Sequence, residues 1–168
     1  MKLKIKSFQE TRNRGYCGPA SLKIVFGYWG LNMSEKKLAG LCGVSRELGV
    51  SNEKMAAVAR RLGFETAVKE KAGFRDIEKW LARGVPPIVD WFSPGRPDAP
   101  ESEMADGHSS VVAGLDKTHI FLQDPELGRI RKIKRDDFLK AWFDFKGKYV
   151  KPNELVVRHL MAIYPKPS

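Results

Sequence analysis

The spacing of apolar residues changes from helical to alternating about half-way along the chain. In the first half, apolar residues recur every three or four positions, a spacing typical of amphipathic helices. This spacing predicts four helices, over residues 16–30, 34–43, 51–63 and 74–83. Short strands are expected over residues 1–9 and 64–68. The first half is therefore expected to be mainly helical.

The second half is dominated by short apolar runs that end at proline, glycine or other turn residues. They predict strands over residues 86–92, 109–115, 119–123, 129–134 and 155–164, with a helix over residues 136–143. Helices followed by hairpins predict an α+β fold, with a helical N-terminal half packed on an antiparallel sheet from the C-terminal half. Neither a repeat nor a linker divides the 168 residues, so one domain over residues 1–168 is expected.

The composition suits a compact globular domain, because 42% of the 168 residues are hydrophobic. The formal net charge is +10, but the positive residues are scattered along the chain among acids and strand hydrophobes. This distribution indicates a basic solvated surface and argues against a nucleic-acid partner. No apolar run approaches the roughly 20 residues of a membrane span. Residues 1–7 also lack the apolar core of a signal peptide, so a cytoplasmic location is expected.

Cys17 is the candidate nucleophile. A thiol attacks as its thiolate, and a helix N-terminus favours negative charge through its unpaired N–H groups and its dipole. Cys17 begins the first predicted helix, and Pro19 is typical of a first helical turn. Gly18 would leave room for a substrate beside the sulfur. The alternative is a structural cysteine, which is the interpretation we give to Cys42 in its apolar helix end.

His108 is the candidate general base among the three histidines. It lies where a loop meets a strand, and side chains at such positions commonly contact substrates. His119 and His159 lie inside strand patterns instead, where a histidine is more often structural. A carboxylate beside His108 would fix the tautomer of its imidazole and stabilise the protonated ring.

Asp124 is the carboxylate that strand pairing brings to His108. A two-residue turn at 116–117 would place Asp124 opposite Ser109, and a loop over 115–117 would place it opposite His108. Either register predicts that carboxylate and imidazole lie within about 5–8 Å on adjacent strands. The alternative is an aspartate that only caps the turn after its strand.

Acyl transfer also needs donors for the oxyanion of the tetrahedral intermediate. The backbone N–H of Cys17 is one candidate, and the side-chain amide of Gln9, in the polar loop before the helix, is another. No cofactor or metal is expected, because the chain has no paired ligand spacing such as Cys-x-x-Cys.

Two features near His108 have a functional and a structural interpretation. The acidic segment 98–106 is either a lid that recognises cationic substrates or a plain solvated loop. Trp91 and Phe92 either line the cleft or pack in the core of their strand.

The order of these motifs resembles that of the C39 and C39-like cysteine peptidases, which have a papain-like fold. The resemblance covers most of the chain and is carried by Gln9, by Tyr16-Cys17-Gly18-Pro19-Ala20-Ser21-Leu22, by Gly107-His108-Ser109-Ser110-Val111-Val112-Ala113-Gly114, and by Asp124-Pro125-Glu126-Leu127-Gly128. It implies Cys17 as nucleophile, His108 as general base and acid, Asp124 as orienting group and Gln9 as oxyanion-hole donor. The best-known members are fused to export transporters and cut leader peptides after a Gly-Gly pair. This chain carries no transporter portion, so that substrate is not expected to carry over, and a partner transporter would be encoded elsewhere.

The expected activity is hydrolysis of amide bonds in a peptide or protein substrate through a thioester on Cys17. Three rival functions remain open: a non-catalytic peptide-binding or regulatory domain of the same fold, an acyltransferase using the same site, and a basic nucleic-acid binder.

Overall fold

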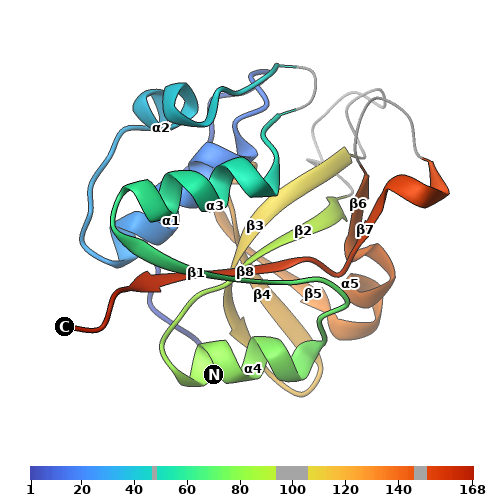
Figure 1. Cartoon of the computed structure of the whole chain (residues 1–168). Coiled ribbons are helices and arrows are strands. Elements are labelled where there is room, and N and C mark those ends of the chain that lie inside the picture. Colours follow the sequence, from blue (N-terminus) through green and yellow to red (C-terminus); the bar gives the residue numbers. More distant parts are fainter. Residues whose placement is uncertain (47–48, 94–105, 146–150) are drawn as a thin grey trace.

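The computed structural model describes residues 1–46, 49–93, 106–145 and 151–168. A central antiparallel sheet lies between two groups of helices (Figure 1). One face of the sheet carries α1 (Cys17–Tyr28), α2 (Glu35–Cys42) and α3 (Asn52–Arg61). The other face carries α4 (Phe74–Ala82) and α5 (Arg135–Ala141).

The central sheet has six strands in the order β1-β8-β2-β3-β4-β5, and all neighbouring strands are antiparallel. The strands are β1 (Phe64–Lys69), β2 (Ile88–Ser93), β3 (Asp106–Leu115), β4 (His119–Asp124), β5 (Arg129–Lys134) and β8 (Leu160–Pro165). A second, two-stranded sheet pairs β6 (Phe143–Phe145) with β7 (Leu155–Val157), which a 3-10 turn over Pro152–Glu154 precedes. The α+β class with an antiparallel sheet, predicted from the apolar spacing, is confirmed.

Three details differ from the prediction. Residues 1–9 form no named strand, although Lys2 makes an isolated bridge to Gly114. The strand expected over 155–164 is two strands, because the backbone turns at Arg158, whose φ of 48° is left-handed. β1 comes from the helical half but pairs with β8, so the sheet draws on both halves of the chain.

Two hydrophobic cores explain why the central strands are apolar on both faces. Val111 of β3 packs with α1, α2 and α3, and its neighbour Val112 packs with α4 and α5 on the other face. Strands covered on both faces lose the alternation of polar and apolar residues. Each such side chain contributes about 1.5–3 kcal/mol when fully buried. This packing fixes β3 between the two groups of helices.

The N-terminal end of α1 is held against β3 and α3 by close packing. The Ser21 hydroxyl donates to the Ser109 carbonyl at 3.3 Å, one residue after His108. Gly18 is buried, and a Cβ there would lie 2.3 Å from Cγ1 of Val50. Glycine at position 18 thus makes room for Val50, and the expected room for a substrate beside the sulfur stays a prediction.

No helix in these described ranges has the length and apolar character needed to cross a bilayer, and α1 has 12 residues.

Candidate active site

Cys17 is the first residue of α1, and its side chain is partly exposed. No side-chain hydrogen bond caps this helix at Tyr16, and the first turn contains no acidic residue. The positive end of the helix dipole is thus not neutralised by the helix's own side chains, and it favours negative charge on an atom placed there. Cys42, in contrast, is buried, and burial raises the pKa of its thiol to about 11.

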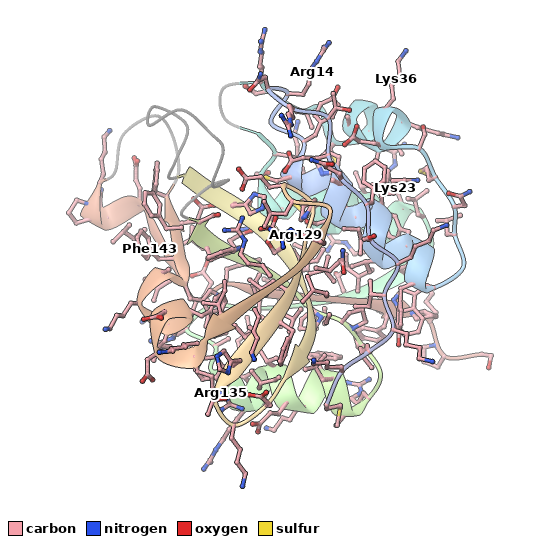
Figure 2. The ribbon with its side chains drawn as sticks, turned by 180° about the vertical axis from the view of Figure 1, so that it is seen from behind. Arg14, Lys23, Lys36, Arg129, Arg135 and Phe143 are labelled. Carbon is pink, nitrogen blue, oxygen red and sulfur yellow. The ribbon has the colours of Figure 1, made fainter. Side chains whose placement is uncertain are left out.

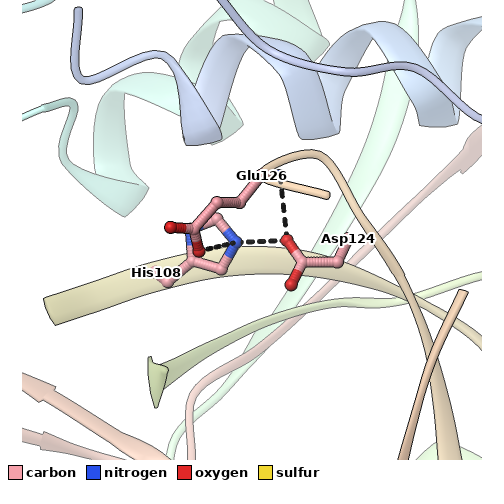
Figure 3. A group of neighbouring side chains, drawn as sticks. All are labelled: His108, Asp124 and Glu126. Atoms are coloured by element: carbon pink, nitrogen blue, oxygen red, sulfur yellow. Dashed lines mark hydrogen bonds and ion pairs between the residues drawn. The ribbon is translucent and has the colours of Figure 1, made fainter. Parts of the chain in front are cut away.

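The strand pairing brings His108 and Asp124 into direct contact (Figure 3). His108 lies near the start of β3 and Asp124 ends β4, and both side chains are buried. The Nε2 atom of His108 lies 2.5 Å from Oδ1 of Asp124. Because Nε2 is used in this contact, the ring nitrogen left for another partner is Nδ1.

The register that produces this contact is neither of the two predicted. β3 and β4 pair Val111 with Gln123, and a bulge after Val112 shifts the pairing nearer the turn. Continued by one residue, this register sets Asp124 opposite Ser110. His108 is then its diagonal neighbour on the same face, within reach of a carboxylate. Asp124 and His108 are therefore close, as predicted, but they are diagonal neighbours in the sheet and not directly or nearly opposite each other.

The thiol of Cys17 reaches the same imidazole. Burial alone would lower the pKa of His108, but the charge and hydrogen bond of Asp124 and those of Cys17 raise it well above its usual value. A raised pKa of the imidazole means that the site stabilises the protonated ring. The structure therefore brings together three of the four predicted site residues: Cys17, His108 and Asp124.

Asp124 is held as a carboxylate by three partners. Burial would raise its pKa, but the charge and hydrogen bond of His108, the charge of Arg131 and the Glu126 amide together lower it. The backbone N–H of Glu126 donates to Oδ1 at 3.0 Å, and Nε of Arg131 lies 2.8 Å from Oδ2. Oδ1 thus accepts a hydrogen bond, and Oδ2 takes part in an ion pair with Arg131.

Gln9 packs against the turn that follows Asp124. Its amide donates to the Glu126 carbonyl at 3.5 Å, and its Cβ lies 2.7 Å from where a Cβ on Gly128 would stand. Gly128 has a φ of 65°, so glycine serves both the turn and this close approach. Among the described residues no hydrogen bond joins Gln9 to Cys17. The structure places Gln9 beside the carboxylate's turn and exposed to solvent.

Three charged residues of the site were missed from the sequence: Glu10, Glu126 and Arg131. Glu126 extends from its turn toward the imidazole, with Oε2 3.8 Å from Nε2 of His108 (Figure 3). Burial, then the charges of Glu126, Asp124 and Glu35, raise the pKa of Glu10 to about 7 against the lowering effect of His108. Glu10 also donates its backbone N–H to Pro125 at 2.8 Å. The signals that the sequence offered are the position of Glu10 directly after Gln9 and that of Glu126 two residues after Asp124.

The ligand atoms of His108, Asp124 and Glu126 lie within 4.8 Å of one another, and these residue types can bind a divalent cation. The guanidinium of Arg131, however, lies 2.8 Å from Asp124 and 3.7 Å from Glu126. A cation between these carboxylates would face a fixed positive charge. The donors fit an ion-pair network better than a metal centre.

Comparisons with known proteins show the family and the fold of this chain. Residues 3–150 match the Peptidase_C39 like family. The chain belongs to that family. It is 30% identical over 128 residues to the transport/processing ATP-binding protein ComA of Streptococcus pneumoniae, a match that covers 75% of this chain and 16% of ComA. This chain thus aligns with a small part of that relative.

Solved structures show the same fold. The peptidase domain of Streptococcus ComA, described as a bifunctional ABC transporter in quorum sensing, superposes with a TM-score of 0.70 at 20% identity, covering 96% of this chain and 98% of that one. A double glycine motif protease from an AMS/PCAT transporter, solved with its leader peptide, gives a TM-score of 0.68 at 19% identity, covering 98% and 94%. The predicted membership in the C39-like peptidases and their fold is confirmed.

Trp91, Phe92 and His159, which the sequence analysis also considered, make contacts that support the fold. Trp91 is buried under His108 and donates its indole N–H to Ser110 at 3.0 Å, so it is a core residue. Phe92 is half-buried and stacks on Phe143 with ring centres 5.4 Å apart. His159 is buried with Nδ1 3.7 Å from Asp90.

The last two sequence predictions concern His119 and the acidic segment 98–106. His119 Nδ1 contacts the neighbouring Thr118 hydroxyl at 2.7 Å, away from the cysteine. Residues 98–105 of the acidic segment lie outside the described residues, so the lid hypothesis stays a prediction.

Proposed function

We propose that this C39-like chain is a cysteine peptidase with Cys17 as nucleophile, His108 as general base and acid, and Asp124 as orienting carboxylate. The observation that carries the proposal is the contact of one imidazole with both the Cys17 thiol and the Asp124 carboxylate. Membership in a peptidase family makes this chemistry the one to expect from such an arrangement.

The first half of the cycle forms a thioester. The ring nitrogen Nδ1 of His108 takes the proton of Cys17, and the thiolate attacks the substrate's amide carbonyl carbon. The carbonyl oxygen becomes an oxyanion as the C–S bond forms. His108 then gives its proton to the amide nitrogen, the C–N bond breaks, and the amine leaves. Asp124 stabilises the protonated ring between these two proton transfers.

The second half releases the acid. Water attacks the thioester carbonyl while His108 takes its proton, and the C–S bond breaks to restore the thiol. Backbone N–H groups at the start of α1 support the oxyanion in both halves. Gln9 joins them only if its amide turns away from the Glu126 carbonyl, which it contacts at the long distance of 3.5 Å.

The proposed substrates are peptides, as expected of a member of a peptidase family. Because one structural relative binds a leader peptide with a double glycine motif, peptides containing such a pair are the first to test. A separate transporter chain is the partner to test with them. The reaction requires a free thiol at Cys17, which a reducing compartment such as the cytoplasm maintains.

Selective alkylation tests the nucleophile. At about pH 6, iodoacetamide should modify Cys17 at least about tenfold faster than Cys42, because Cys17 is partly exposed beside an imidazole, whereas Cys42 is buried and its pKa is raised to about 11. His108→Ala should slow Cys17 to the rate of an ordinary exposed cysteine while leaving Cys42 unchanged. Mass spectrometry of tryptic peptides gives both rates in one sample.

Turnover of peptides then separates the rival functions. Cleavage by the wild type and none by Cys17→Ala supports the peptidase. Equal, slow alkylation of both cysteines, together with peptide binding, would overturn the proposal in favour of a binding module. Products that carry an added amine in place of a hydroxyl would show an acyltransferase instead.

A further inference from the structure

Arg131 lies against the carboxylate that orients the imidazole, on the side away from the ring. β5 pairs with β4 so that Arg131 stands opposite Leu122, which puts its side chain on the face of Asp124. Its Nε atom lies 2.8 Å from Oδ2 of Asp124, and Nη2 lies 3.7 Å from Glu126. The Arg131 side chain is only 13% exposed, so solvent screens these contacts weakly.

The position of the guanidinium is fixed by an aromatic ring below it. Its carbon Cζ lies 5.4 Å from the centre of the Trp91 ring, a distance typical of cation–π contact. Trp91 is itself held by its hydrogen bond to Ser110. A planar guanidinium can stack on a ring and at the same time form an ion pair with a carboxylate at its edge, which a lysine ammonium cannot do.

The two cations beside Asp124 differ in one respect that matters for catalysis. The charge of His108 comes and goes, because the ring gains the proton of Cys17 and later gives it to the leaving amine. The charge of Arg131 stays. A buried carboxylate without a cation tends to take up a proton, and a protonated Asp124 would be a weaker acceptor for the Nε2–H of His108 and would carry no charge to hold that tautomer.

We propose that Arg131 is a positioning residue of the peptidase site: it keeps Asp124 ionised when His108 is neutral, and so keeps the imidazole in the tautomer whose Nδ1 accepts the Cys17 proton. This inference rests on the proposed function. The charged and titratable groups described around the pair are Glu10, Cys17, Glu126 and Arg131 itself. Arg131 is the fixed cation in this set.

The pH profile of Cys17 alkylation tests the proposal. Removing a fixed positive charge makes every neighbouring group bind protons more tightly. The acid limb of the profile reports loss of the proton shared by Cys17 and His108, and the alkaline limb reports loss of the second proton. In Arg131→Gln, both limbs should therefore move to higher pH, by about one unit for a partly buried charge. Arg131→Lys keeps the charge, so its limbs should stay close to those of the wild type.

Arg129→Gln is the matched control. Arg129 lies on the same strand and pairs with Asp124 in the register, but it is exposed. Arg129→Gln removes a positive charge that water screens, so the pH profile of this variant should overlay that of the wild type. Arg131→Met, whose apolar chain preserves packing on Trp91, replaces Arg131→Gln if melting shows the latter unfolded.

The outcomes separate this inference from the proposed function. A wild-type profile like that of an ordinary thiol would overturn both. A wild-type profile with an acid-shifted limb, which neither Arg131→Gln nor Arg131→Met moves, would overturn the role of Arg131 alone. Equal shifts in Arg131→Gln and Arg129→Gln would also overturn it, because they would reflect net charge only.

Discussion

Glu10 is a carboxyl group surrounded mostly by other carboxyl groups. Burial and the charges of Glu126, Asp124 and Glu35 raise its pKa to about 7, so the folded protein holds this proton near neutral pH. The unfolded chain releases it near the ordinary value of 4.5. Stability is therefore lost as the pH rises from 4.5 to 7, since the unfolded state ionises first.

Replacement of Glu10 by glutamine should remove this loss. Glutamine resembles the protonated acid, so Glu10→Gln should unfold like the wild type at about pH 4 but be more stable by about 1–3 kcal/mol at about pH 8. Urea unfolding at the two pH values measures the difference. Glu70→Gln, at an exposed turn, is the control and should change stability little at either pH. A wild-type advantage at the higher pH would contradict the pKa assigned to Glu10.

At this scale, the sequence pointed to Cys17 and His108, the proposed nucleophile and base, but missed their neighbours. Cys17 and His108 stand at a helix start and a strand start, and local patterns reveal such places. Glu10 and Arg131 act through tertiary contacts: one lies in the segment that folds over the Asp124 turn, and the other depends on the β4–β5 register. No local pattern fixes either contact.

At the scale of elements, helix ends were easier to predict than strand register. Ser34 and Ser51 were expected to open helices, and each accepts a hydrogen bond from a backbone N–H three residues on, at 3.1 and 3.2 Å. The β3 bulge had no such signal. It lies where the first residues of the chain cross the strand, with the Leu3 N–H donating to Ala113 at 2.7 Å. The bulge therefore depends on a contact between segments far apart in sequence.

Gly114 allows that crossing, and its replacement tests it. A Cβ on Gly114 would lie 2.7 Å from the Met1 carbonyl oxygen and 2.6 Å from Cγ of Lys2. Gly114→Ala should therefore destabilise the protein by about 1–3 kcal/mol, the usual effect of overpacking. It should also speed hydrogen exchange of the Leu115 N–H, which donates to Met1.

Gly27→Ala provides the opposite case. Gly27 is exposed within α1, and nothing lies within 4 Å of a Cβ built there. Alanine should stabilise the helix by about 0.5–1 kcal/mol. Urea unfolding compares the two variants. If Gly114→Ala matched the wild type in stability and in exchange at Leu115, the crossing would not constrain β3.

At the scale of the whole molecule, the positive charge is spread over distant parts of the surface. Figure 2 shows Arg14 and Lys36 at one end of the molecule and Arg135 at the other. The net charge of +10 then acts on approaching molecules as a general field. This distribution favours the predicted solvated surface over a nucleic-acid interface.

Such a field should favour acidic substrates at low salt. For two peptides with the same residues around the cut, one with an acidic tail should have the higher kcat/KM in about 0.02 M salt. Raising the salt to about 0.5 M should lower its kcat/KM by about tenfold and leave the neutral peptide within about twofold. A tail preference that persists at high salt would point to a specific contact instead of the field.

The position of β8 between β1 and β2 in the sheet has a consequence for a chain that is still being made. Position 17 is synthesised before β8, the strand that joins β1 to the strands next to His108. Until β8 has docked, the sheet that carries the imidazole is incomplete, so we expect the Cys17 thiol of a growing chain to react only like an ordinary thiol.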